Sequence, residues 1–218
     1  MDIYPKMNNN NTALIVIDPI NSCAHEKCET PEWDIHFSKI RQMLLKLNSF
    51  IKEYREKVGG LVVITTIVPW VQDSVAQNIN ELYTDPSACY YSEDRTGFDE
   101  EFYIVEPEVT DYIFTKNTYD AFANDALVEF LKTKEIRYII MAGVFTDGCV
   151  LASVIGGFSR GYNFVILKDL VETFDLPVRQ ELQKLLLEYT FPRLYGKVIV
   201  STELLLDSNF VQKTSNIV

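Results

Sequence analysis

The stretch Met141-Ala142-Gly143-Val144-Phe145-Thr146-Asp147-Gly148-Cys149-Val150 decides the fold, because it joins a predicted buried strand to a predicted helix. The apolar run 138–142 is typical of a parallel strand that is buried on both faces. The strand breaks at Gly143, and the apolar pattern of 150–155 predicts a helix. Cys149 is therefore expected at the start of a helix, where unpaired N–H groups and the helix dipole favour a thiolate. Two interpretations are open, a nucleophile and a small buried core residue.

Outward from this stretch, short apolar runs alternate with amphipathic segments. The apolar runs predict strands at 12–18, 61–67, 111–116, 137–142, 163–167 and 197–200. The amphipathic segments predict helices at 34–57, at 125–134, from Cys149 to Arg160 and at 178–189, and Ser201 is expected to cap a last turn at 202–206. This alternation predicts an α/β fold, a three-layer sandwich in which a mainly parallel sheet carries helices on both faces.

The chain is expected to form a single domain, because no linker, internal repeat or change in composition divides residues 1–218. The polar tract 8–11 predicts that residues 1–11 are mobile. Residues 71–110 have no clear period and mix acidic with aromatic side chains, which predicts an irregular excursion. A lid-like cover over the pocket and a surface excursion without a role in chemistry are both open for this segment.

The composition excludes several classes of partner. The chain has 31 acidic and 20 basic residues and a formal net charge of −11, which argues against binding nucleic acid or an anionic membrane surface. The N-terminus does not look like a signal peptide, and no apolar run is long enough to span a membrane. The four cysteines, Cys23, Cys28, Cys89 and Cys149, match no zinc spacing, so we expect reduced thiols and a cytoplasmic location. No Gly-rich phosphate loop is present, so no nucleotide cofactor is expected.

Three reactive side chains stand at the C-terminal ends of predicted strands: Asp18, Lys116 and Cys149. Because the C-terminal ends of parallel strands share one edge of a sheet, the three can converge on one crevice. Singly, Asp18 could cap a loop and Lys116 could be solvated. Together they supply the nucleophile, the base and the cation that amide hydrolysis by a thiol needs.

The sequence resembles the isochorismatase-like cysteine hydrolases over about residues 12–205. The resemblance rests on Ile17-Asp18, on Lys116 before Tyr119-Asp120-Ala121-Phe122, and on Gly143 to Val150, and it is supported by Gly161-Tyr162 and Asp169. It implies a six-stranded parallel sheet of order 3-2-1-4-5-6 and a homodimer or homotetramer. It also implies a cis peptide bond between Val144 and Phe145, with the N–H groups of Phe145 and Cys149 facing a developing oxyanion.

The expected reaction is hydrolysis of a small amide, carbamoyl or ureide substrate through a thioester. Asp18 takes the thiol proton from Cys149, and Lys116 keeps Asp18 ionised and stabilises the thiolate. The Cys149 thiolate attacks the carbonyl carbon, and Asp18 returns the proton to the leaving amine. Water activated by Asp18 then hydrolyses the thioester.

The chain also departs from the family. The run Asp18 to Cys23 matches the frequent pattern Asp-x-Gln-Asn-Asp-Phe only at Asp18 and Asn21, which leaves Asn21 as a candidate substrate-binding residue. Nicotinamidases of the family bind a metal with histidines, whereas this chain has only His25 and His36, neither of which follows the second strand. A nicotinamidase role and a catalytic metal are therefore not expected. Isochorismatases proper lack the cysteine, so Cys149 points away from them.

Further candidates for the substrate-binding wall are aromatic residues near the predicted edge: Trp70, Tyr119, Phe122 and Phe145. Core packing is the alternative for each of them. For the whole chain, the alternative to a hydrolase is a catalytically idle relative that serves as a binding or scaffold protein. A redox thiol protein is not expected, because the chain has no Cys-x-x-Cys motif.

Overall fold

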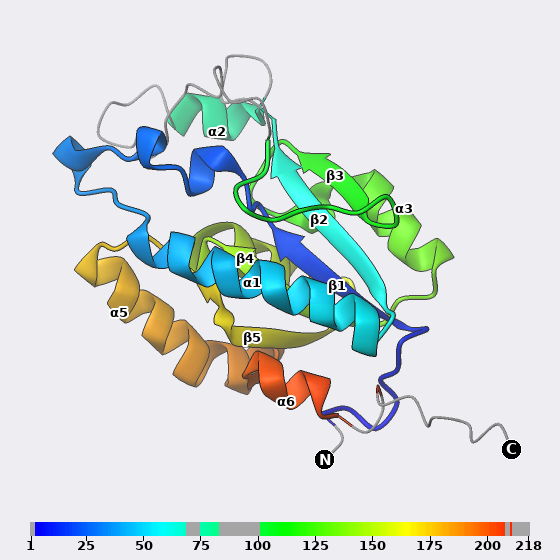
Figure 1. The fold of residues 1–218 in the computed structure, drawn as a ribbon. Helices are drawn as coiled ribbons and strands as arrows, with labels where there is room; N and C mark the ends of the chain where they lie inside the picture. The colour runs from blue at the N-terminus through cyan, green and yellow to red at the C-terminus, as the bar shows by residue number, and fades with distance from the viewer. Residues whose placement is uncertain (1–2, 69–74, 83–100, 208–209, 211–218) are drawn as a thin grey trace, which may run out of the picture.

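The computed structural model describes residues 3–68, 75–82, 101–207 and 210. A six-stranded sheet of order β3-β2-β1-β4-β5-β6 forms its centre, and each adjacent pair of strands is parallel (Figure 1). The strands are β1 (Thr12–Ile17), β2 (Leu61–Ile67), β3 (Tyr112–Lys116), β4 (Tyr138–Val144), β5 (Asn163–Glu172) and β6 (Gly196–Ile199). The predicted α/β class and the strand order 3-2-1-4-5-6 are both confirmed.

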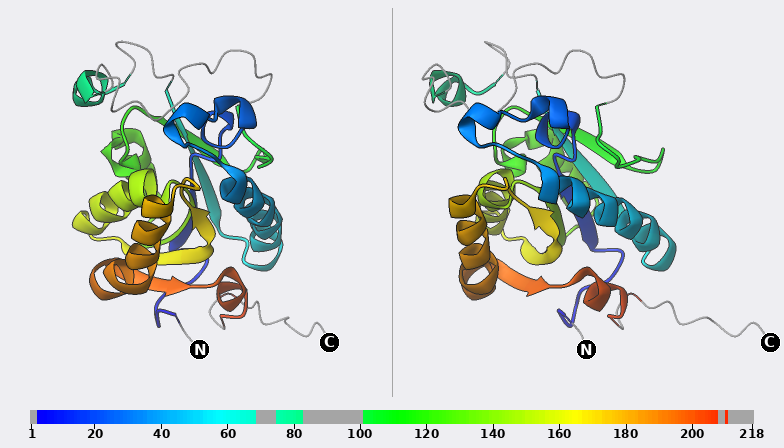
Figure 2. Two further views of the ribbon diagram at one scale, coloured as in Figure 1. Left: turned by 90° about the vertical axis from the view of Figure 1, so that its left-hand side faces the viewer. Right: turned by 60° about the vertical axis from the view of Figure 1, so that its left-hand side comes forward.

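Helices cover both faces of the sheet. On one face α1 (Ser38–Lys57) packs over β4 and β5 beside α6 (Ser201–Leu205). The opposite face carries α3 (Asp125–Thr133), α4 (Leu151–Ser159) and α5 (Pro177–Leu185), as the edge-on view in Figure 2 shows. A short helix, α2 (Gln77–Leu82), lies near the C-terminal end of β2 (Figure 1). The sandwich has the predicted three layers.

The pattern of apolar residues explains why the sheet lies in the core of the protein. Every residue of β1 and β4 is buried, which fits their uninterrupted apolar sequences. The buried apolar residues of α1 recur mostly every three or four positions, on the side of the helix that faces the sheet: Ile40, Met43, Leu44, Leu47, Phe50, Ile51 and Tyr54. The central strands are therefore covered on both faces, and their polar groups are left at the strand ends.

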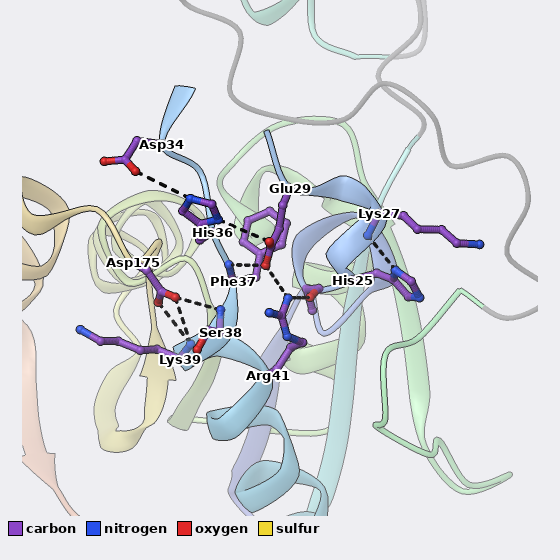
Figure 3. Close-up of polar contacts among 11 residues, drawn as sticks. His25, Lys27, Glu29, Asp34, His36, Phe37, Ser38, Lys39, Arg41 and Asp175 are labelled. Atoms are coloured by element: carbon purple, nitrogen blue, oxygen red, sulfur yellow. Dashed lines mark hydrogen bonds and ion pairs between the residues drawn. The ribbon is translucent and has the colours of Figure 1, made fainter. Parts of the chain in front are cut away.

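The loop between β1 and α1 is fastened by side chains (Figure 3). The Glu29 carboxylate accepts hydrogen bonds from the Phe37 N–H at 3.0 Å and from Arg41 Nη1 at 2.6 Å, and it also contacts His36 Nδ1. Partial burial would raise the pKa of Glu29, but these donors lower it, so the carboxylate stays charged. Asp175, which lies in the turn between β5 and α5, accepts hydrogen bonds from the N–H groups of Ser38 and Lys39 and so caps the N-terminus of α1.

Several predicted boundaries are wrong. The helix predicted at 34–57 begins only at Ser38, and the helix predicted at 178–189 consists of α5 followed by η7 (Leu186–Tyr195), which has a π-helical backbone. The fifth strand continues to Glu172, so Asp169 lies within it. Ser201 does not cap α6 with its side chain, because its hydroxyl donates to Asp169 Oδ2 at 2.6 Å.

The segments predicted to be irregular or mobile include described residues with contacts and secondary structure of their own. Residues 3–11 lie against the body of the protein: Met7 is buried, and the Tyr4 hydroxyl donates to the Phe164 carbonyl. The mobility of residues 1–11 stays a prediction from the sequence. Of the predicted excursion at 71–110, residues 77–82 form α2, and 71–74 and 83–100 lie outside the described residues.

Candidate active site

Asp18 is the first residue after β1, and the backbone there turns sharply, with a φ of +48°. Its side chain is completely buried. Thr65 of β2 holds it from the neighbouring strand: the Thr65 hydroxyl donates to Asp18 Oδ1 at 2.8 Å and accepts from the Asp18 N–H at 3.2 Å. One hydroxyl therefore fixes both the backbone and the carboxylate of Asp18, and Oδ2 is left for another partner.

That partner is Lys116, the last residue of β3. Its Nζ lies 2.7 Å from Asp18 Oδ2 and 3.3 Å from Cys149 Sγ, and it also donates to the Thr118 carbonyl at 3.1 Å. The lysine side chain is only 2% exposed. The structure thus brings together Asp18, Lys116 and Cys149, the three residues that the sequence predicts at one edge of the sheet.

Burial and the charges of neighbouring groups both shift the pKa values of this cluster. Burial would lower the pKa of Lys116, but the adjacent Asp18 and Cys149 groups outweigh it and raise that pKa, so the ammonium persists at neutral pH. For Cys149, desolvation dominates the attraction of Lys116 and raises the pKa of the thiol to about 12. Asp18 also hydrogen-bonds the Cys149 side chain and favours its protonated form. The resting site therefore holds a neutral thiol between a lysine cation and an aspartate.

Cys149 sits in a short helical segment, η6 (Thr146–Val150), which leads into α4. Gly148 has non-helical backbone angles, so the chain kinks directly before the cysteine. The turn is held closed by hydrogen bonds from the N–H groups of Gly148 and Val150 to the Phe145 carbonyl. As the sequence predicts, the thiol follows a strand, at the beginning of a helix.

The side chains of this turn are tied to α5. Arg179 donates from Nε to Asp147 Oδ2 and from Nη2 to Oδ1, and Thr173 donates to the same carboxylate. Next to them, the Thr146 hydroxyl donates to Gln183 Oε1 at 2.6 Å. Asp147 is 4% exposed, so its ion pair with Arg179 is largely shielded from water. The position of the turn therefore depends on α5.

The backbone before the turn is tightly constrained. The peptide bond between Val144 and Phe145 is cis, as the resemblance implies. Gly143 has a φ of +110°, and a Cβ there would lie 2.1 Å from the Ile17 carbonyl oxygen. Only glycine fits, because of both the backbone angle and the close approach to β1. The main chains of β4 and β1 thus touch directly beside Asp18.

The candidate substrate-binding residues have different environments. Asn21 is buried, and its N–H donates to the Glu101 carbonyl, so the segment from 101 covers the turn after β1. Tyr119 is half-buried in the loop that follows Lys116. Phe145 is buried, with its ring 4.3 Å from that of Phe174, and this position agrees with the packing alternative for its side chain.

Phe122 also agrees with the packing alternative. Its ring is completely buried and lies against Tyr162 and Phe164, and a Cβ on Gly157 would lie 2.7 Å from it. A contact of Phe122 with substrate stays a prediction from the sequence. Gly157 is inside α4, so the small residue there is explained by this close packing. Trp70, the remaining candidate, lies outside the described residues.

Sequence reasoning missed the residues that hold the cluster in place. Thr65 and Thr66 are adjacent in a buried strand, and only the structure shows that Thr65 faces Asp18 whereas Thr66 pairs with Thr115. Ser153 of α4 accepts from the Ala121 N–H and donates to the Tyr119 carbonyl, which ties α4 to the loop after Lys116. A polar residue in an apolar strand or helix was the available signal in both cases.

The histidines belong to the loop before α1. His25 Nδ1 accepts from the Lys27 N–H, and His36 lies between Glu29 and Asp34 (Figure 3). Within the described part of the chain, no group of three or more His, Cys, Asp or Glu side chains could hold a metal ion. None of the helices described in the structure is long and apolar enough to cross a membrane.

Comparisons with known proteins give a family and two kinds of relative. The model of the isochorismatase domain matches residues 12–203. An uncharacterised isochorismatase family protein, PncA of Bacillus subtilis, is 36% identical over 70 residues, which are 32% of this chain and 37% of that protein. The ureidoacrylate amidohydrolase RutB of Klebsiella pneumoniae is 22% identical over 178 residues, 72% of each chain. The match with the higher identity, that to PncA, thus covers little more than a third of PncA's length.

Among solved structures, a cysteine hydrolase from Pseudomonas syringae pv. phaseolicola is similar, with a TM-score of 0.77 and 20% sequence identity. The superposition covers 95% of this chain and 96% of that protein. At this identity the likeness shows the fold, an α/β sandwich over nearly the whole chain.

Proposed function

Because the chain belongs to the isochorismatase domain family, we propose that it is a cysteine-dependent hydrolase that cleaves a small non-peptide C–N bond. The substrate class is an amide, a carbamoyl compound or a ureide. The observation that carries this proposal is the position of Lys116 Nζ, 2.7 Å from Asp18 Oδ2 and 3.3 Å from Cys149 Sγ. A thiol, a carboxylate and a fixed cation in mutual contact are the groups that thiol-dependent acyl transfer needs.

In the first half of the reaction, Cys149 forms a thioester. Its thiol is protonated in the resting site, because burial raises the pKa of Cys149 to about 12. Attack of Sγ on the substrate carbonyl is therefore coupled to transfer of the thiol proton to Asp18. Lys116 offsets the negative charge on sulfur as it develops. The C–N bond then breaks, and the proton passes from Asp18 to the leaving nitrogen.

The tetrahedral intermediate carries its negative charge on the former carbonyl oxygen. We assign its stabilisation to the N–H groups of Phe145 and Cys149, which flank the kinked turn. Removing one such donor costs about 3–4 kcal/mol in a well-studied protease, so the geometry of this turn matters as much as the thiol. The ties from Arg179 and Gln183 to the turn support this role.

In the second half, water replaces the amine. Asp18, ionised again after the amine has left, takes a proton from water, and the hydroxide oxygen attacks the thioester carbonyl. The C–S bond breaks, the thiolate regains the proton from Asp18, and the carboxylic acid product leaves. Asn21 and Tyr119, and Trp70 from the sequence, are proposed to contact the substrate. RutB, an amidohydrolase of ureidoacrylate, makes ureides the first compounds to test.

The test is turnover of a substrate panel by the wild type and by Cys149→Ala. The panel contains carbamoyl amino acids, ureides, and aryl and aliphatic amides. We expect release of ammonia or amine by the wild type and a loss of at least 1,000-fold in Cys149→Ala, since the nucleophile is removed. Cys28→Ala, which removes another buried thiol, is the matched control and should keep its activity. Full activity of Cys149→Ala would refute the mechanism.

The second candidate function is a catalytically idle binding or scaffold protein. Burial of all three reactive side chains is the observation that favours it, because the resting site is closed to solvent. Mass spectrometry distinguishes the two: quenching during turnover should trap an acyl group on Cys149, and this adduct should be absent in Asp18→Asn. If no panel compound acylates Cys149 and its alkylation rate does not respond to Asp18→Asn, the idle protein is the better description. A cytoplasmic location and a homodimer or homotetramer stay predictions from the sequence.

A further inference from the structure

A hollow in the surface lies between α3 and the end of α4, two helices on the same face of the sheet (Figure 2). Its volume is about 510 Å³, within the range of roughly 300–1,000 Å³ that small-molecule sites have. Arg137 and Tyr162, which line it, directly precede β4 and β5. Cys149 follows the other end of β4, and this strand separates the two places by roughly 20 Å. The hollow is therefore not part of the candidate active site.

The hollow is positively charged, although the protein as a whole is acidic. Lys132, Arg137 and Arg160 line it, and Asp125 is the single carboxylate beside them. The whole chain, in contrast, has a formal net charge of −11. A local excess of cations attracts anions to that place. We call it the α3–α4 hollow and define it by these four residues together with Tyr162.

The cations of the α3–α4 hollow are poorly neutralised by the protein itself. Within the described part of the chain, the side chains of Lys132 and Arg137 make no ion pair and no hydrogen bond. Arg160 is held more firmly: its Nη1 donates to the Gly156 carbonyl at 3.0 Å and lies 3.9 Å from Asp120 Oδ2. Like charges repel one another, so this arrangement costs stability unless an anion occupies the hollow.

Tyr162 supplies a neutral hydrogen-bond donor beside the cations. It is only 8% exposed, and its ring packs against that of Phe122, with 5.2 Å between the ring centroids. Burial raises the pKa of Tyr162 and outweighs the charge of Arg160, which lowers it, so the hydroxyl stays protonated. This hydroxyl makes no hydrogen bond within the residues that the structure describes, although buried tyrosines usually find a partner. It is therefore available to a ligand in the hollow.

Helix dipoles explain two of the cations without a ligand, but not the third. Lys132 lies in the last turn of α3 and Arg160 is the C-terminal cap of α4, where positive charge is favourable. Arg137 belongs to neither helix. Its backbone is fixed on both sides, because its N–H donates to the Asn11 carbonyl at 2.9 Å and its carbonyl accepts from the Asn163 N–H at 2.9 Å. The structure thus holds a third cation beside the other two.

We propose that the α3–α4 hollow binds a small phosphate monoester. The phosphate group carries close to two negative charges at neutral pH, and its oxygens match the planar fork of an arginine. Arg137, Arg160 and Lys132 hold this group, and the Tyr162 hydroxyl donates to it. A carboxylate, with a single charge, would leave more of the positive charge without a partner.

The rest of the lining accommodates the organic part of the ligand. Val128 and Ile136 give the α3–α4 hollow an apolar surface. Asp125 lies about two helical turns, roughly 10 Å, from Lys132 along α3, so its carboxylate is distant from the phosphate group. The ligand is therefore a phosphate monoester with a compact apolar part, and its binding does not rest on the proposed function.

The test is isothermal titration calorimetry with phenyl phosphate at an ionic strength of about 0.15 M. We expect the wild type to bind it with a Kd below about 1 mM, and to bind inorganic phosphate at least fivefold more weakly, since that ion lacks the apolar part. Arg137→Gln should raise the Kd at least 10-fold, and Tyr162→Phe about 3- to 10-fold. Arg193→Gln is the matched control: it removes an exposed arginine of η7 outside the hollow and should change the Kd less than twofold.

Several results would overturn the proposal: no binding of phenyl phosphate at 10 mM, equally tight binding of inorganic phosphate, or an unchanged Kd in Arg137→Gln. Lys132→Gln repeats the measurement if Arg137→Gln does not fold, and both side chains are exposed. Alkylation of Cys149 by iodoacetamide checks the location, because saturating phenyl phosphate should change its rate less than twofold. Strong protection of the thiol would place the ligand at the candidate active site instead. None of these measurements needs turnover, so a wrong ligand site is distinguished from a wrong function.

Discussion

Among single residues, Thr65 is the side chain on which the orientation of Asp18 depends. We predict that Thr65→Val lowers kcat about 10- to 100-fold, because Asp18 loses a donor to Oδ1 and an acceptor for its N–H. A loss of about 1–3 kcal/mol in the free energy of unfolding should accompany it, since two buried polar groups are left unsatisfied. Measured kcat and urea unfolding check both effects.

Two further variants distinguish positioning from general damage. Thr65→Ser keeps the hydroxyl and should recover most of kcat. Thr66→Val, on the other side of the same strand, removes a hydroxyl that pairs with Thr115 and should leave kcat within about twofold of the wild type. Equal losses of kcat in the two valine variants would show that Thr65 has no special role.

The pH dependence of alkylation reports the state of Cys149. The thiolate is the reactive form, and burial raises the pKa of Cys149 to about 12. The rate with iodoacetamide should therefore still rise about tenfold per pH unit between pH 8 and 10, where a free cysteine with a pKa of about 8.5 reaches its plateau. A plateau below pH 9 would show that Lys116 outweighs desolvation.

The three residues of the candidate cluster could be found from the sequence, but the residues that hold them in place could not. Asp18, Lys116 and Cys149 each follow an apolar run, and parallel strands bring such ends together. Thr65 has no comparable mark, because whether it or Thr66 faces Asp18 depends on the register between β1 and β2. The burial of Phe122 could not be read from the sequence for a related reason: an aromatic residue near a strand end looks the same in sequence whether it faces a ligand or the core.

Among the elements, α5 and the turn of Cys149 act together. We predict that Arg179→Met lowers the free energy of unfolding by about 2–3 kcal/mol, because the buried carboxylate of Asp147 loses its charged partner. Differential scanning calorimetry should show a Tm lower by about 5–10 °C. The kcat should fall as well, since the turn carries the thiol.

Arg160→Met is the control for this prediction. Arg160 lies at the end of α4, 41% exposed, and its nitrogen is 3.9 Å from Asp120, so its ion pair is weak and solvated. Its Tm should change by no more than about 2 °C. A similar loss of stability in both variants would mean that the buried ion pair between Arg179 and Asp147 stabilises the fold no more than an exposed ion pair does.

The periodicity of α5 was visible in the sequence, but its orientation was not. Leu182, Leu185 and Tyr189 recur at helical spacing, and a pattern of this kind says that a helix has an apolar side without saying what covers it. The inward direction of Gln180 and Gln183 depends on Glu172, which the sequence placed beyond the fifth strand. The extra length of β5 brings that carboxylate within reach of α5.

For the whole molecule, the homodimer or homotetramer predicted from the family resemblance would make stability depend on concentration. Unfolding of a dimer gives two chains, so mass action raises the Tm as the protein concentration rises. We predict an increase of about 3–5 °C for a 100-fold increase in concentration of the wild type, measured by scanning calorimetry. A constant Tm of the wild type over this range of concentration would argue against an oligomer.

The overall architecture could be predicted from the sequence more fully than the packing of single elements or residues. The alternation of strand-like and helix-like segments in the sequence identified the α/β class. The family resemblance supplied the strand order, which this alternation alone does not contain. What sequence could not supply was the packing of residues 3–11, where Met7 is buried and Ile3 donates to Asp207, 204 positions along the chain. Such contacts link segments without any shared pattern, so only the folded chain reveals them.

The contact between Gly143 and Ile17 has a consequence for redesign of the proposed hydrolase. The spacing between Asp18 and Cys149 depends in part on the place where the main chains of Gly143 and Ile17 touch, which an exchange of surrounding side chains leaves unchanged. Libraries that vary Asn21, Tyr119 and other candidate residues around the cluster, but keep Gly143, should therefore retain the reactive group as a fixed unit. Selectivity for new amides can then be searched without rebuilding the chemistry.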